Sequence, residues 1–196
     1  MGDKCTKFFH QVANVDRRNN SIESLSMNGS STLNPAIIGN HIVNFDESLF
    51  SEPLSWRPRV DNLEFEVLKV DEVASLEEPF EEREVREVIN GMDRAKAPGS
   101  NGFSLAFYQD CWEVVRGDFM AVFTNFHSQS KFVKSIISTF ILLIPKIHGA
   151  KEIKEFCPIS LVGGVYKIIA KVLANRMRRI MDRIISKPQN TFVKGR

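Results

Sequence analysis

Two short apolar runs followed by a long amphipathic segment constrain the fold of this 196-residue chain most strongly. The first run, STFILLIPK over residues 138–146, is rich in β-branched and aromatic side chains and ends near a proline. The second run, PISLV, comes after a polar loop, so residues 139–162 are predicted to form a β-hairpin with a long basic loop. Residues 165–185 are predicted to form a helix whose broad apolar stripe packs on this hairpin.

Shorter patterns earlier in the chain also predict secondary structure. Phe8, Val12 and Val15 fall at helical spacing. The Asn28-Gly29 pair favours a tight hairpin turn, because such turns need positive φ angles. A helix is expected to begin at Asn34-Pro35, since Asn caps helices and Pro suits the first helical position. Another helix is predicted over residues 81–92.

The stretch KAPGSNGF, residues 96–103, is predicted to break the helical pattern, because Pro-Gly pairs and further glycines favour turns. Ser104 is expected to cap the next helical region, which extends to about His127 with Gly117 as its break. The side chains expected to face inward here are Phe107, Cys111, Val114 and Val115.

Charge is distributed unevenly along the chain. Residues 1–95 contain 10 Lys and Arg against 18 Asp and Glu, whereas residues 96–196 contain 16 against 6. The basic half indicates a partner that is a polyanion. An alternative is that the two halves neutralise each other within the fold. The hydrophobic content of 43% is sufficient for a core.

No signal peptide and no apolar run of about 20 residues is present, so the expectation is an intracellular protein, in the nucleus or cytoplasm, without a membrane partner. The three cysteines are far apart and predict neither a disulfide framework nor a zinc site. The four histidines lack ligand spacing, and no metal site is predicted. Cys157 has two readings from its neighbours, a reactive thiol or a small apolar side chain.

Four segments together resemble the reverse transcriptase of plant non-LTR (LINE-type) retrotransposons. They are GDKCTKFFHQVAN (2–14), KAPGSNGFSLAFYQDCWE (96–113), TFILLIPKIHGAKEIKEFCPISLVGGVYKIIAKVLANRM (139–177) and ISKPQNTFVKGR (185–196). The resemblance implies that residues 1–79 are a linker before the polymerase and that residues 80–196 are its N-terminal extension and fingers. The expected fold is α+β, mostly helical with a fingers-type β-hairpin, and is an incomplete right-hand polymerase lacking palm and thumb.

The resemblance also bears on catalysis. The family's essential aspartates lie in the palm, which begins where this sequence ends, and they hold the two metal ions that nucleotidyl transfer needs. We therefore expect no catalytic residue and no cofactor in this fragment, whereas the intact family uses Mg²⁺. The chain is expected to be inactive alone and at most to bind the backbone of an RNA template or RNA–DNA hybrid.

The binding residues follow from the family and from charge. By resemblance, Lys146 faces the incoming nucleotide, and Cys157 occupies the position of a family arginine that does the same. Lys96 and Gly99 belong to a loop next to the template, where glycine permits close backbone approach. The basic rows of the 165–185 helix are the other predicted nucleic-acid contacts: Lys167, Lys171, Arg176, Arg178, Arg179 and Arg183. A solvated helix face is the alternative.

Two other functions remain open at this level. One is an active reverse transcriptase, completed by a palm encoded downstream. The other is a domesticated protein-interaction module that has lost nucleic-acid binding. Without a palm to cover it, the apolar stripe of the 165–185 helix is also expected to favour self-association.

Overall fold

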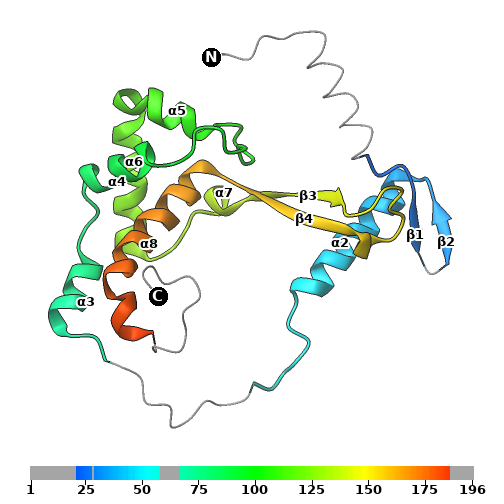
Figure 1. The fold of residues 1–196 in the computed structure, drawn as a ribbon, viewed down its shortest axis with the longest axis horizontal. Helices are drawn as coiled ribbons and strands as arrows, with labels where there is room; N and C mark the ends of the chain where they lie inside the picture. Colours follow the sequence, from blue (N-terminus) through cyan, green and yellow to red (C-terminus); the bar gives the residue numbers. More distant parts are fainter. Residues whose placement is uncertain (1–20, 28, 58–66, 186–196) are drawn as a thin grey trace. The chain divides into compact units, whose positions relative to one another are not determined.

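The computed structural model describes residues 21–27, 29–57 and 67–185. The helix predicted around Phe8 and the resembling segment 2–14 lie outside these residues, as does nearly all of the segment 185–196. The elements, shown in Figure 1, are β1 (Leu25–Met27), β2 (Ser30–Thr32), α2 (Pro35–Phe50), α3 (Val70–Glu77), α4 (Glu82–Asn90), α5 (Leu105–Asp110), α6 (Trp112–Gln129), α7 (Lys134–Ile137), β3 (Thr139–Pro145), a 3-10 turn (Ile153–Glu155), β4 (Phe156–Val162) and α8 (Gly164–Ile184). Helices and strands in this mixture are compatible with the predicted α+β class, and the polymerase fold stays a prediction.

The chain divides into two compact units. The first unit comprises Met1–Arg59 and Ile141–Ile159, and the second comprises Val60–Phe140 and Ser160–Arg196. This division differs from the boundary predicted at residue 79, because α3 packs against α8 and so belongs with the later helices. The assignment of a linker and a fingers region stays a prediction.

The core of the second unit is helical and aromatic. Ile168, Ile169 and Val172 of α8 are completely buried, and α8 makes its most extensive contacts with α4. We expected this stripe to pack on the β-hairpin, but its core partners are helical instead. The buried side chains around it are Val85, Val88, Ile89, Leu105, Tyr108, Trp112, Phe119 and Phe123. Much of the stripe is therefore covered within the unit, whereas Met177 is 48% exposed, and self-association through this stripe stays a prediction.

The helical region after residue 104 is broken at Cys111, not at Gly117 as predicted. Ser104 caps α5 as expected, because its hydroxyl accepts a hydrogen bond from the Phe107 N–H. The break changes the helical phase, so α6 buries Trp112 and places Val114 in solvent, 84% exposed. The prediction that Val114 faces inward was wrong for this reason.

The first unit contains the predicted tight hairpin. Leu25 pairs with Thr32 and Met27 with Ser30, and Gly29 in the turn has a φ angle of +82°. Helix α2 begins as predicted, with the Asn34 side chain accepting a hydrogen bond from the Ala36 N–H. A small core forms among Leu25, Ile38 and Phe156.

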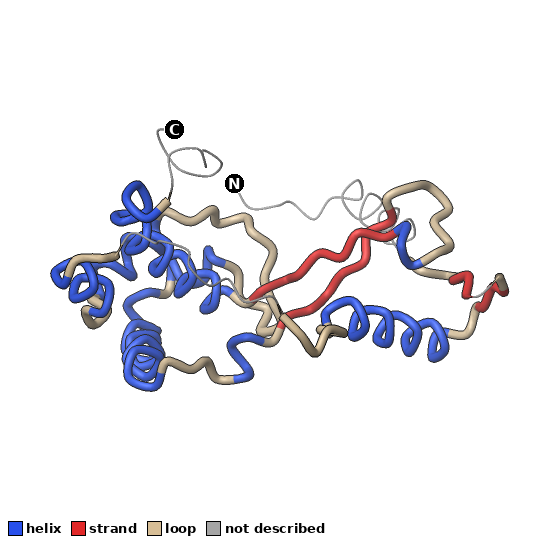
Figure 2. Tube along the Cα trace, turned by 90° about the horizontal axis from the view of Figure 1, so that it is seen from below, coloured by secondary structure: helices blue, strands red, loops and turns tan. Residues whose placement is uncertain are grey.

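Strands β3 and β4 form the predicted second hairpin and run side by side in Figure 2. The Lys146 N–H donates to the Glu155 carbonyl at 2.8 Å, which closes the hairpin next to its loop. Among the described residues, none of the helices has the length and apolar character required to cross a membrane.

Candidate nucleic-acid interface

The loop over residues 96–103 is fixed against the beginning of α8. A Cβ atom added to Gly99 would lie 2.5 Å from both the N and Cα atoms of Gly163, so the two backbones are in direct contact. Nζ of Lys167 reaches back from α8 and donates to the Ala97 carbonyl at 2.9 Å. The hydroxyl of Ser100 donates to the carbonyl of Ser138 at 3.3 Å. Three contacts, two with the beginning of α8 and one with Ser138, therefore hold this loop.

The start of the loop is held by a polar network between α4 and α5. Arg94 donates from Nη2 to Oδ2 of Asp110 at 2.6 Å and from Nη1 to Oε1 of Gln109 at 2.9 Å. Gln109 in turn donates to the carbonyls of Ile89 and Met92. The hydrogen bond from Arg94 holds the pKa of Asp110 below its ordinary value, because it favours the ionised carboxylate.

The end of the loop is tied to the core through Tyr108. Nδ2 of Asn101 donates to Oη of Tyr108 at 3.1 Å, while Oδ1 of Asn101 accepts from the Phe103 N–H. Burial raises the pKa of Tyr108 above its ordinary value, because the phenolate is poorly solvated there. Gly102 between them has a φ angle of +74°, a conformation that favours glycine.

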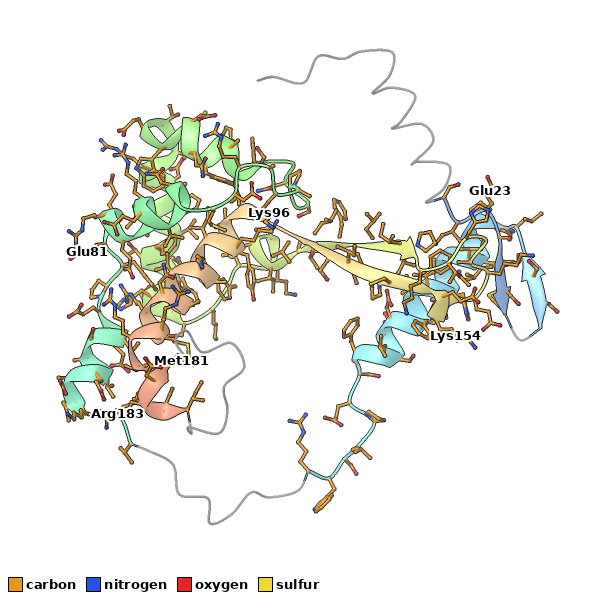
Figure 3. The ribbon with its side chains drawn as sticks, viewed as in Figure 1. Glu23, Glu81, Lys96, Lys154, Met181 and Arg183 are labelled. Carbon is orange, nitrogen blue, oxygen red and sulfur yellow. The ribbon has the colours of Figure 1, made fainter. Side chains whose placement is uncertain are left out.

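The structure gives Gly99 a different role from the predicted one. We expected its missing side chain to admit the nucleic-acid backbone. Gly99 is instead buried, and the space without a Cβ is filled by Gly163. The glycine is required for internal packing, whereas Lys96 in the same loop is exposed. Figure 3 labels Lys96 on this loop.

Helix α8 presents one row of basic side chains to solvent. Lys167, Lys171 and Arg178 are separated by four and seven residues, which places them on one side of the helix over a length of about 16 Å. Lys171 and Arg178 are exposed, and Lys167 is half-buried. Together with Lys96 we call these three residues the basic row. The contact between Lys167 and Ala97 places Lys96 next to the start of the row.

Arg176 does not belong to this surface, and its prediction as a nucleic-acid contact is corrected. Its residue exposure is 5%, and all five guanidinium N–H groups have partners. Nε and Nη2 bind the carboxylate of Glu84 at 2.9 and 2.7 Å, while the other donors bind the carbonyls of Leu76, Glu78 and Pro79. The guanidinium also lies 4.3 Å from the centre of the Phe80 ring. No donor is left for a phosphate.

Two further arginines of α8 lie beside acidic groups. Arg183, which was predicted to bind phosphate, forms an ion pair with Glu72 of α3 and also donates to the Val67 carbonyl. Its guanidinium is therefore engaged within the protein. Arg179 is exposed, but it borders a cavity of about 260 Å³ that is lined by four glutamates. Those residues are Glu78, Glu81, Glu84 and Glu87. Arg83 and Arg176 line the same cavity, but the glutamates outnumber them, which makes Arg179 a weaker candidate than the basic row.

The two predicted nucleotide contacts lie in the first unit, at the loop end of the β3–β4 hairpin. Lys146 is exposed, and its Nζ donates to the Lys154 carbonyl at 3.0 Å. Cys157 is also exposed, with its Sγ 3.9 Å from the Pro158 carbonyl. The exposed thiol contradicts the reading of Cys157 as an apolar filler of the core.

A cavity of about 530 Å³ lies beside Lys146 in this unit. His148, Lys151 and Glu23 also line it, and Cys157 is not among the lining residues. Sequence reasoning noted a basic loop here but did not single out these side chains. Only the charge of this loop could have indicated His148 and Lys151 in the sequence, because their spacing matches no motif.

The described residues hold no metal-binding cluster. No group of three or more His, Cys, Asp or Glu side chains within the described ranges could hold a metal ion. What the geometry offers is an ordered basic surface, made by the basic row and the loop that packs on it.

The chain is similar to a transposon protein. It is 27% identical over 203 residues to the "Transposon TX1 uncharacterized 149 kDa protein" of Xenopus laevis, and the match covers 99% of this chain. The chain spans 15% of the length of that relative. A comparison with models of known protein families finds no match. The similarity supports a transposon-related protein, whereas the plant origin and the reverse-transcriptase region stay predictions.

Proposed function

We propose that this chain is a part of a retrotransposon reverse transcriptase, from its fingers region, and that the second unit binds the backbone of RNA or of an RNA–DNA hybrid. The observation that carries the proposal is the basic row: four cations lie along α8 and the loop packed on it, and Lys171, Arg178 and Lys96 are exposed. Such rows bind phosphates without reading sequence.

The proposal is one of binding, not of catalysis, for the described residues. Nucleotidyl transfer needs two metal ions clamped by carboxylates. The Asp110 carboxylate is bound by Arg94, and no group of three or more His, Cys, Asp or Glu side chains among the described residues could hold a metal ion. Because the transposon relative is much longer than this chain, the alternative of an active enzyme requires carboxylates from another part of a longer protein.

The test is the salt dependence of binding to a single-stranded RNA, measured by fluorescence anisotropy. The variant Lys167→Gln/Lys171→Gln/Arg178→Gln removes three cations of the row. Each cation that neutralises a phosphate contributes about 0.7 to the slope of log K against log salt, so the slope should flatten by about 2.

A charge-matched control removes three exposed cations elsewhere, Arg57, Arg83 and Arg86, whose side chains are between 50% and 83% exposed. This control should leave the slope unchanged, because each of these arginines already pairs with a glutamate. Equal slopes for the wild type and the row variant would rule out the row as the binding surface. Binding of a specific protein without any salt-dependent RNA binding would favour the interaction module.

A further inference from the structure

Phe103 is an exposed aromatic side chain at the end of the loop that carries Lys96. Its ring lies against the Phe107 ring, with centroids 4.3 Å apart and planes inclined by 27°. The Tyr108 ring approaches it at 6.4 Å in an edge contact. Phe103 is nevertheless 46% exposed. One face of the ring is thus covered by Phe107, while almost half of the residue stays accessible to solvent.

The backbone around Phe103 is held in place on both sides. Its own N–H donates to Oδ1 of Asn101 at 3.2 Å, and the same Asn101 donates to the buried Tyr108. Ser104, the next residue, caps α5. A ring that is held in this way loses little conformational entropy when a second flat group is placed on it.

The loop that ends at Phe103 carries one cation and binds another at its beginning. Lys96 lies in the same loop, and the Lys167 ammonium is bound to the loop at Ala97. Proteins that bind single strands combine cations that follow the backbone with aromatic rings on which bases stack. Phe103 lies outside the buried core cluster, whereas its neighbours Tyr108 and Phe107 are in or against it.

We propose that Phe103 is a stacking platform for an unpaired nucleobase of a strand whose phosphates contact the basic row. The inference rests on the proposed function and adds the class of ligand: a single strand with accessible bases. Every base has a π-face, so the contact selects single-stranded over duplex nucleic acid without selecting a sequence.

The experiment compares two probes of equal length, an oligothymidylate and an abasic deoxyribose-phosphate oligomer, in the full chain. The wild type should bind the oligothymidylate more tightly. Phe103→Leu keeps an apolar contact with Phe107 but removes the flat ring, and should lose at least about fivefold in affinity for the oligothymidylate, the lower range of one stacked base. Its affinity for the abasic oligomer should stay unchanged, and Phe103→Tyr should retain both affinities.

Trp56→Leu, which removes an exposed aromatic side chain of the first unit, is the matched control and should lose nothing. Equal losses on both probes would show that Phe103 only positions the loop, and no loss on either probe would show that no base stacks there. Both results overturn the stacking platform while leaving salt-dependent binding, and with it the proposed function, in place. Absence of salt-dependent binding in the wild type would overturn both.

Discussion

Buried Arg176 of α8 and partly buried Glu84 of α4 form a two-pronged ion pair, with Nε–Oε1 and Nη2–Oε2 distances of 2.9 and 2.7 Å. Their side chains are 6% and 20% exposed. The same guanidinium binds one carbonyl in the last turn of α3 and two in the segment that follows it. This arginine therefore joins three parts of the second unit, and its charge serves the fold.

Arg176→Ala should destabilise the second unit by about 3 kcal/mol, because it leaves the partly buried Glu84 carboxylate and three carbonyls without their partner. Urea unfolding followed by the fluorescence of buried Trp112, in a Trp56→Phe background, measures this. Arg83→Ala is the control: its side chain is 83% exposed and its ion pair with Glu87 is 4.0 Å long. It should change the free energy of unfolding by less than about 0.5 kcal/mol. Equal effects of the two substitutions would contradict this account.

Gly99→Ala should destabilise the second unit by about 1–3 kcal/mol, because the new methyl group would overlap the backbone of Gly163. The displaced loop should also bind RNA more weakly through Lys96. Gly117→Ala is the matched control, since nothing lies within 4 Å of its added Cβ. Within α6 it should stabilise the chain by about 0.5–1 kcal/mol. Thermal unfolding of both variants shows whether each substitution raises or lowers the stability. A Gly99→Ala variant that is more stable than the wild type would refute the close contact.

The Arg94–Asp110 pair makes stability depend on pH in the acid range. The folded pKa of Asp110 is lowered from 3.8, so the pair stabilises the fold above that pH and is lost as the pH falls through the folded pKa. An NMR titration of the Asp110 carboxyl carbon should give a midpoint below 3.8 in the wild type. Arg94→Gln should move this midpoint back towards 3.8. A wild-type midpoint at or above that value would show that the pair does not form in solution.

Cys157→Arg tests the nucleotide contact implied by the family resemblance. Cys157 is exposed at the beginning of β4, so the longer side chain has room and stability should change by less than about 0.5 kcal/mol. The forked guanidinium should raise the affinity for inorganic triphosphate, measured by calorimetry, because a thiol offers phosphate no comparable donors. Lys146→Gln in the same background should remove the gain. Unchanged affinity in Cys157→Arg would argue against a phosphate site at this end of the hairpin.

Local patterns predicted most of the secondary structure, because the signals were themselves local. The Asn34 and Ser104 caps, the turn at Gly29 and the β3–β4 hairpin follow from residues within a few positions of each other. The break at Cys111 escaped prediction. Glycine at 117 is tolerated in a helix, whereas the burial of Trp112 against the other helices fixes the phase of α6.

The sequence predicted the basic side chains of α8 as one nucleic-acid-binding surface. In the structure, some of them form internal ion pairs and others are exposed. The sequence alone determined that α8 is long, amphipathic and basic, since helical spacing fixes which residues share a side. Only the tertiary structure decided that Arg176 and Arg183 pair with Glu84 and Glu72, while Lys171 and Arg178 stay in solvent. The physical reason is that a cation's partner lies about a hundred residues away in the chain, so its availability to a phosphate depends on packing between helices.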